Sequence, residues 1–197
     1  ALNDFIGILT TTTAPAMFAP GGLEKILGTN PFSIGFPSVK NPIIIDMSST
    51  NVARGKIKEA MKKGEKIPID WALDKNGNST DDPQEALNGS LQPLGGYKGF
   101  ALALAIDILS GILSESASGK EIFGTSMHIS DSNKKTAYKG DLFIAIDISK
   151  FTDINSFKSR VSNLTKDIIY IPGERAYKNK NKLIEIDDEL YKEIMDF

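Results

Sequence analysis

The stretch Leu27–Ala53, LGTNPFSIGFPSVKNPIIIDMSSTNVA, decides the fold, because it contains two strand-like runs and an acid beside a polar turn. Ile43–Ile45 form a β-branched run that is typical of a strand buried on both faces. Asp46 follows directly, and Ser48–Thr50 are candidate N-caps for a helix over 51–63. Open α/β sheets place ligand contacts at such strand ends. The stretch therefore predicts a binding site.

The rest of the chain predicts a sheet of at least four strands with flanking helices. The strand candidates are short and apolar, with Gly, Pro, Ser or Asn at their ends. They are Phe5–Leu9, Phe32–Phe36, Ile43–Met47 and Leu142–Ile148. We expect an amphipathic helix over Asn51–Lys63, and a buried helix over Gly99–Ser114, which is apolar on nearly every face.

The pattern changes near Ser149, where polar helical segments replace the strands. We expect helices over Ile154–Ile168 and Asp188–Met195, separated by a strand and turn over Ile169–Glu174. The predicted fold class is therefore α/β, a mixed sheet with flanking helices. We place a domain boundary near Ser149, so that residues 1–148 would form the ligand-binding domain. Residues 149–197 would form a C-terminal segment that returns to a helical domain whose N-terminal part is absent.

Composition limits the function classes. At 197 residues and 41% hydrophobic content, the chain is long enough for a substantial core. A formal charge of −2 gives no basic field for phosphate backbones, so we expect no nucleic-acid partner. The lack of cysteine fits a reducing compartment, and we expect the cytoplasm. The longest apolar run, Phe100–Leu109, contains Asp107 and is too short to span a membrane. Because Phe5–Leu9 already looks like a strand, we expect that the beginning of the protein is missing.

One loop partly matches the pattern of a calcium-binding loop but lacks residues that such a loop requires. Acids and amides fall at the ligand positions of a helix-loop-helix calcium loop, but Ser79 stands where glycine is needed and Lys75 adds a positive charge. We therefore predict an Asx-type turn around Asn76 and Gly77 and no metal site. The apparent ligands are Asp74, Asn76, Asn78, Asp82 and Glu85.

The single histidine and the glycine-rich turn at Gly95–Gly99 are each weak evidence for a function. His128 is the only histidine, and no carboxylate pattern accompanies it, so a structural role is favoured over a catalytic one. No G-x-G-x-x-G opens a helix, and GGYKG at Gly95–Gly99 lacks the Walker ending. Lys98 between glycines before a helix indicates either an anion site or a tight turn.

Taken in order, the motifs resemble one family closely. Together they resemble the malate/L-lactate dehydrogenase family of NAD(P)-dependent oxidoreductases. In chain order the motifs are LGTNPFSIGFP, IIIDMSSTNVARGKI, GEKIPIDWALDKNGNSTDDP, LQPLGGYKGFALALAIDILSGIL, GDLFIAIDISKF and IPGERAY. That family includes sulfolactate, ureidoglycolate and diketogulonate dehydrogenases and is distinct from the Rossmann-type enzymes. The resemblance runs from about Ile6 to Glu174. It implies a non-Rossmann, L-sulfolactate dehydrogenase-like NAD(P)-binding domain, and it identifies the chain with the carboxyl-terminal three-fifths of such a protein.

The resemblance also implies which residues bind the cofactor, NAD or NADP. The three matching segments agree with the chemistry, because carboxylates accept hydrogen bonds from ribose hydroxyls, lysine pairs with phosphate, and a Pro-Gly turn allows close backbone approach. Thr12, in a segment similar to the family's Thr-Asn-rich strand end, is an additional candidate. The segments are Asp46, Met47 and Ser48; Lys98; and Pro172, Gly173 and Glu174.

The chain departs from the family pattern in two ways. The family's acid/base histidine and its substrate-binding histidine and arginine lie upstream of the segment that matches Phe5–Leu9, so we expect no catalytic residue in this chain. The LGGYKG turn is also shorter than in many relatives, which predicts a shorter loop over the cofactor.

The resemblance implies hydride transfer between NAD(P) and a small 2-hydroxy or 2-oxo acid, with malate as the first candidate. It also implies a homodimer, so Gly99–Ser114 would serve either the core or dimer packing, with the core favoured. A different hypothesis remains: a non-catalytic nucleotide-binding or oligomerisation module, if the 197 residues are the whole product. Arg54 and Lys56 would meet a 2′-phosphate of NADP or would simply be solvated.

Overall fold

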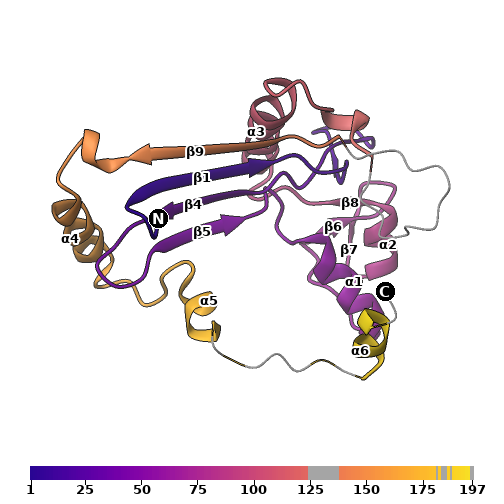
Figure 1. Cartoon of the computed structure of the whole chain (residues 1–197). Coiled ribbons are helices and arrows are strands. Elements are labelled where there is room, and N and C mark those ends of the chain that lie inside the picture. Colours follow the sequence, from indigo (N-terminus) through magenta and orange to yellow (C-terminus); the bar gives the residue numbers. More distant parts are fainter. Residues whose placement is uncertain (124–137, 181, 183–185, 187, 196–197) are drawn as a thin grey trace.

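The computed structural model describes residues 1–123, 138–180, 182, 186 and 188–195. Its largest element is a four-stranded sheet in the order β5-β4-β1-β9. This sheet occupies one side of the molecule, and the short helices α1 and α2 with a small sheet occupy the other (Figure 1). The strands of the large sheet are β1 (Phe5–Thr11), β4 (Phe32–Phe36), β5 (Ile43–Met47) and β9 (Asp141–Asp147).

Every pairing in the large sheet is antiparallel, and the register brings two rows of side chains across one face. The strand period of two places each row on the same face. One row runs Asp46, Ser33, Leu9 and Phe143, and the next runs Ile44, Gly35, Gly7 and Ala145. The second row carries almost no side-chain bulk apart from Ile44, so this face of the sheet is open beside Asp46.

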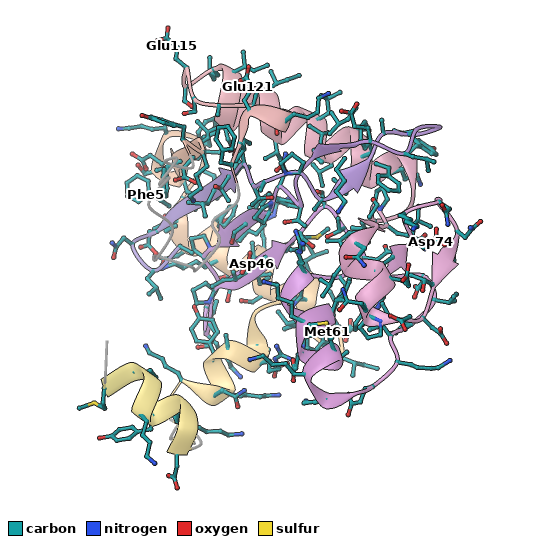
Figure 2. The ribbon with its side chains drawn as sticks, turned by 90° about the vertical axis from the view of Figure 1, so that its right-hand side faces the viewer. Phe5, Asp46, Met61, Asp74, Glu115 and Glu121 are labelled. Carbon is teal, nitrogen blue, oxygen red and sulfur yellow. The ribbon has the colours of Figure 1, made fainter. Side chains whose placement is uncertain are left out.

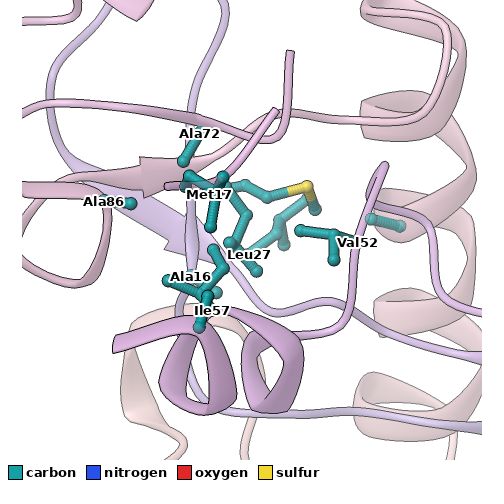
Figure 3. Packing of buried hydrophobic residues seen from close by; sticks show 11 residues of the cluster. Ala16, Met17, Leu27, Val52, Ile57, Ala72 and Ala86 are labelled. Atoms are coloured by element: carbon teal, nitrogen blue, oxygen red, sulfur yellow. The ribbon is translucent and has the colours of Figure 1, made fainter. Parts of the chain in front are cut away.

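The second half of the molecule surrounds the hydrophobic core. Helix α1 (Arg54–Lys63) buries Ile57 and Ala60 against two small sheets. Figure 3 shows Ile57 below Ala16, Met17 and Leu27 in this cluster. Full burial of a side chain of the size of Ile or Met stabilises the folded state by about 1.5–3 kcal/mol relative to leaving it exposed. The small sheets pair β2 (Met17–Phe18) with β3 (Lys25–Leu27), and β6 (Ala72–Leu73) with β7 (Ser79–Thr80) and β8 (Ser90–Leu91); α2 spans Pro83–Asn88.

The remaining elements are helical. Helix α3 (Tyr97–Asp107) continues directly as the π-helix η1 (Ile108–Ile112). Within the described residues, none of the helices is long and apolar enough to cross a membrane. The others are the 3-10 turns η2 (Gly119–Glu121) and η3 (Ile148–Lys150) and the helices α4 (Ile154–Thr165), α5 (Glu174–Asn179) and α6 (Asp188–Met195).

The structure confirms the α/β class, the four predicted strands to within two residues at either end, and the bounds of α6. It corrects the first interpretation of Ile43–Ile45. These residues are half-buried rather than buried on both faces, because β5 is an edge strand of an antiparallel sheet. Asp46 therefore does not lie at the switch point of an open parallel sheet. A ligand site at Asp46 must instead be formed by the segments that pack against the edge strand β5.

The start of α1 is also later than expected. The hydroxyl groups of Ser49 and Thr50 donate to the carbonyls of Thr29 and Val52 instead of capping a helix. The Asn51 N–H donates to the Gln92 carbonyl. This segment is therefore held by its neighbours as a connector, and the helix begins at Arg54 with no side-chain cap.

The expectation of a buried helix over Gly99–Ser114 is wrong for half of its surface. Ala103, Ile106 and Asp107 are buried in α3, and η1 buries Ser110 and Gly111. The opposite side exposes a row of large apolar side chains. These are Leu104, Ile108, Leu109, Ile112 and Leu113, each exposed by 44–68%.

Residues 169–171 do not form the expected strand, and Ile169 is fully exposed. Pro172 cannot donate to a strand ladder, and Gly173 adopts a left-handed conformation with φ of 89°, so the chain turns here and enters α5. The Asx-type turn at Asn76 is confirmed, because Asp74 Oδ1 accepts from the N–H groups of Asn76 and Asn78 at 2.8 and 2.9 Å. His128 lies outside the described residues.

A buried polar network joins the two halves of the molecule. Asn30 is completely buried and donates from Nδ2 to the Ala103 carbonyl at 2.9 Å and to Asp107 Oδ2 at 3.0 Å. Its Oδ1 accepts from the Thr13 N–H, and Asp107 Oδ1 accepts from the Gly119 N–H. Asn30 also has a positive φ of 21°, a region that asparagine tolerates better than most residues. One side chain thus connects the strand-end loops with α3.

Replacing Asn30 with Ala should lower the free energy of unfolding by about 3 kcal/mol, because it leaves buried polar partners without hydrogen bonds. Urea denaturation of the purified protein measures this change. Asn163→Ala, at an exposed position of α4, is the matched control and should shift stability by no more than about 0.5 kcal/mol. A similar loss in both variants would show that the network contributes nothing particular.

Candidate functional site

Asp46 is the exposed acid at the end of the edge strand β5. It lies opposite Ser33 of β4, on the open face of the large sheet. Figure 2 places it between the sheet and α1. Within the described part of the chain its carboxylate has no hydrogen bond or ion pair, so both oxygens are available to accept hydrogen bonds from a ligand.

The two residues after Asp46 are placed differently. Met47 points to the opposite face of the sheet, because successive strand residues alternate. The half-buried Ser48 hydroxyl bonds to the Thr50 hydroxyl at 3.0 Å and donates to the Thr50 carbonyl at 3.1 Å. Ser48 therefore shapes the turn, and its backbone rather than its side chain is the more available contact.

The Leu94–Gly99 turn lies directly against this segment. The Leu94 N–H donates to the Ser49 carbonyl at 2.9 Å, and a Cβ added at Gly99 would come within 2.5 Å of the same oxygen. Only glycine permits that approach. The contact sets Lys98 beside the segment that follows Asp46. The Lys98 ammonium is exposed, has no ion-pair partner among the described residues, and stands at the positive end of α3.

The Pro172–Glu174 turn lies against the middle of β5. The Ile44 N–H donates to the Pro172 carbonyl at 3.1 Å, which occupies a donor on the free edge of the sheet. A Cβ at Gly173 would lie 3.0 Å from the Ile44 Cβ, so this turn also depends on glycine. The Glu174 carboxylate bonds to Lys178 at 2.7 Å, and this bond holds the pKa of Glu174 below its usual value.

The structure thus brings together three segments that the sequence separates widely. The Pro172–Glu174 turn docks at Ile44 and the Leu94–Gly99 turn docks at Ser49, five residue steps or roughly 17 Å of extended chain apart. Asp46 lies between these two points. An acceptor, a cation and two glycine turns along one edge suit an extended ligand that carries hydroxyl groups and an anionic group.

Thr12 is placed elsewhere. It is fully buried, its N–H donates to the Gly140 carbonyl, and its hydroxyl accepts from the Gly140 N–H at 2.9 Å. These bonds fasten the chain after β1 to the chain before β9. Among the described residues, no contact joins Thr12 to the other predicted cofactor residues, which lie along β5, in the Leu94–Gly99 turn and in the Pro172–Glu174 turn.

Sequence reasoning missed the row Gly7, Gly35 and Ala145 beside Asp46. A Cβ added at Gly7 would meet nothing within 4 Å, so packing among the described residues does not require glycine there. The signal was present, since an isolated glycine inside a strand indicates close approach of a ligand or of another backbone. Ser33, which faces Asp46 across β4 and β5, had no sequence signal.

Comparison with known proteins gives a consistent result. Residues 1–195 match the profile of a family described as "Malate/L-lactate dehydrogenase". The chain is 46% identical over 202 residues to "Malate/(S)-sulfolactate dehydrogenase" of Methanothermus fervidus, covering 98% of this chain and 58% of that protein.

Solved structures agree with the sequence comparison. The sulfolactate dehydrogenase of Methanocaldococcus jannaschii superposes with a TM-score of 0.83 at 43% identity, covering 97% of this chain and 58% of that one. The malate dehydrogenase of Pyrococcus horikoshii gives 0.82 at 32% identity, covering 100% and 57%. The chain therefore spans about three-fifths of the length of the relatives that it matches.

Replacing Gly173 with Ala should loosen the turn from β5, because an alanine in the left-handed region costs about 1–2 kcal/mol and its Cβ would crowd Ile44. The Ile44 amide, which donates to Pro172, should then exchange with solvent about tenfold faster. Hydrogen exchange followed by NMR measures this rate. Gly55→Ala, where a Cβ meets nothing within 4 Å, should leave the rate unchanged. Equal exchange of Ile44 in all three proteins would contradict the role given to Gly173.

Proposed function

The chain belongs to the malate/L-lactate dehydrogenase family, and on that premise we propose that it is the dinucleotide-binding part of an NAD(P)-dependent oxidoreductase. The observation that carries this proposal is the arrangement along β5. The Asp46 carboxylate has no hydrogen bond or ion pair among the described residues, and the Leu94–Gly99 turn docks beyond it while the Pro172–Glu174 turn docks before it.

Each segment has a definite role in this proposal. Asp46 accepts hydrogen bonds from ribose hydroxyls, and Lys98 with the first amides of α3 binds the phosphates. Met47 and Ser48 contribute backbone groups, and Pro172–Glu174 covers the ligand from the side of α5. Thr12 contributes indirectly, by fixing the ends of β1 and β9. The bound cofactor supplies the hydride donor or acceptor, C4 of its nicotinamide ring.

The residues present fit such a group. Gly95 and Gly96 both have positive φ, and a Cβ at Gly96 would meet nothing within 4 Å, so the backbone of the turn is open to a ligand. The absence of a side chain there allows phosphate oxygens to reach backbone N–H groups. Arg54 begins α1 nearby in sequence and provides a candidate partner for the 2′-phosphate of NADP.

We assign no proton-transfer residue to the described part of this chain. His128, the only histidine, lies outside the described residues, and the family resemblance places the acid/base histidine upstream of β1. In the proposal, therefore, this chain holds and orients the hydride carrier, and another segment exchanges the proton with the substrate oxygen.

The proposed substrate is a small 2-hydroxy acid, with malate as the first candidate. The names of the relatives support this class, since one similar protein is described as acting on both malate and sulfolactate. Sulfolactate is the second candidate. The two acids differ by a planar carboxylate against a tetrahedral sulfonate, which is a difference in shape more than in charge.

The exposed apolar row of α3 and η1 supports a proposed homodimer. An apolar patch of this kind on a soluble protein commonly marks an interface. A pair of such faces related by a twofold axis would bury each other. The lack of cysteine supports placement in a reducing compartment such as the cytoplasm.

The competing function is a non-catalytic nucleotide-binding or oligomerisation module. Both functions predict dinucleotide binding or self-association, but only the oxidoreductase predicts turnover. A purified natural protein that binds NADH and oxidises none of the candidate acids would favour the module.

Lys98→Ala should weaken NADH binding by roughly 1.5–3 kcal/mol, because it removes a charge-assisted contact. Asp46→Ala should weaken it by a similar amount through loss of ribose contacts. Titration of NADH fluorescence measures both affinities. Lys150→Ala, which removes an exposed lysine at the far end of β9, is the control and should bind as the unchanged protein does. Unchanged affinity in both site variants would refute the cofactor assignment.

Steady-state oxidation rates should rank malate above sulfolactate and lactate, with each acid assayed with NAD and with NADP. A kcat/KM at least tenfold higher for malate is the expected result in the full-length protein, since a substrate site that pairs with a second planar carboxylate would lose hydrogen bonds to lactate and would fit a tetrahedral sulfonate less well. If sulfolactate or lactate gives the higher value, the malate assignment is wrong while the oxidoreductase proposal stands.

A further inference from the structure

Lys25, the first residue of β3, lies in a small pocket between β3, the start of α1 and the end of α2. Its side chain is half-buried, and its ammonium donates to the carbonyl of Asn88, the last residue of α2, at 3.3 Å. An ammonium has three N–H donors. Within the described part of the chain, this is the one hydrogen bond that Lys25 Nζ makes, so two of its donors have no protein partner.

The charge that neighbours Lys25 is positive. Arg54, at the first position of α1, lines the same pocket, and these two are the only charged side chains among the described residues that form its walls. Neither of them forms an ion pair with a described carboxylate, and the first turn of α1 contains no acidic residue. Two cations therefore share a small space without a counter-charge from the described residues.

These surroundings make the Lys25 nitrogen more reactive. Burial of the side chain, and then the positive charge of Arg54, lower the pKa of the Lys25 ammonium below its ordinary value. A larger fraction of Lys25 is consequently the neutral amine, which is the nucleophilic form of the side chain.

The pocket has room for a small group only. Its volume is about 10 Å³, close to the space that one water molecule needs. This size favours the smallest carbon electrophile, CO₂, over bulky acyl donors. The remaining walls carry no charge; they include Ala16, which lies beside Ile57 in Figure 3, with Ala86, Leu87, Gly89 and Leu91.

From this arrangement we infer that Lys25 is a carbamylation site, whose amine binds CO₂ covalently and whose carbamate pairs with Arg54. The amine lone pair forms a new N–C bond to the carbon of CO₂, and a C–O π pair moves onto oxygen. One proton passes from the nitrogen to solvent water. No oxidant or reductant takes part, and the inference does not depend on the proposed function.

The carbamate suits the contacts of the pocket better than the ammonium does. Its nitrogen keeps one N–H, which is the number of donors that the Asn88 carbonyl already uses. Its two oxygens share a negative charge beside the Arg54 guanidinium. Repulsion between two cations thus becomes a charge-assisted attraction.

The test equilibrates the purified protein with isotope-labelled CO₂ and bicarbonate. No dinucleotide is added, because Arg54 is also the candidate partner of the NADP 2′-phosphate. Triethyloxonium then converts any carbamate to a stable ethyl ester, which mass spectrometry of peptides locates. Lys25 should carry the label, and its carbamate signal in carbon NMR should rise with CO₂ pressure to saturation. Lys25→Arg, which keeps the positive charge and a donor for Asn88, should abolish that signal.

Arg54→Gln should raise the CO₂ pressure for half-saturation about tenfold, because the carbamate loses its charged partner. Arg160→Gln, at an exposed position of α4 outside the pocket, is the matched control and should leave the half-saturation pressure unchanged. Because Arg54 is exposed, its substitution should leave the thermal unfolding temperature unchanged, so this variant is informative even if Lys25→Arg fails to fold.

An unlabelled Lys25 in the folded, unchanged protein overturns the carbamylation site. A labelled Lys25 whose half-saturation pressure is the same in Arg54→Gln overturns the pairing with Arg54. If chloride raises the unfolding temperature of the unchanged protein while Lys25 stays unlabelled, the pocket holds a free inorganic anion, and that result also overturns the inference.

Discussion

The buried side chain of Asn30 is the contact on which the arrangement of the molecule depends. It binds the loop after β1 through Thr13 and binds α3 through Ala103 and Asp107, and it is itself carried by the segment that enters β4. A buried amide must satisfy its donors and acceptor together, so these segments have one mutual placement and not several. The neighbouring Thr29 carbonyl extends this constraint by accepting from Ser49, which lies between Asp46 and the Lys98 turn.

The candidate site is a consequence of that placement. Ser49 lies where three segments cross, because its carbonyl accepts from Leu94 and its own N–H donates to Thr29. The close approach of Gly99 then fixes Lys98 relative to β5. At the other end, Gly173 allows the chain after α4 to dock on Ile44. The two glycine contacts are steric requirements, whereas Asp46 and Lys98 themselves stay exposed and unpaired within the described residues. The glycines that fix the turns and the exposed residues proposed to bind the cofactor are thus different residues along the same edge.

The local predictions succeeded where the residues themselves carry the physical cause. The strands followed from short apolar runs bounded by turn-forming residues, the Asx-type turn from the residue types around Asn76 and Gly77, and α6 from its polar helical pattern. The local predictions failed where contacts with distant segments determine the role of a residue. Ser49 and Thr50 bond to carbonyls instead of capping α1, and half of the apolar surface of α3 and η1 faces outward because the core accepts only the side with Ala103 and Ile106. Hydropathy alone cannot distinguish an apolar face that is buried in the core from one that stays exposed.

The sequence by itself determined the α/β class, the family and the residue types available for binding, because these depend on local pattern and on the order of motifs. Only the tertiary structure decided that the sheet is antiparallel, that β5 is its edge, and that Thr12 is buried while Asp46 is open. It alone placed Lys25 and Arg54 at one pocket. The physical reason is that backbone pairing and close contacts between distant glycines and carbonyls are relations between segments, and no single segment contains them.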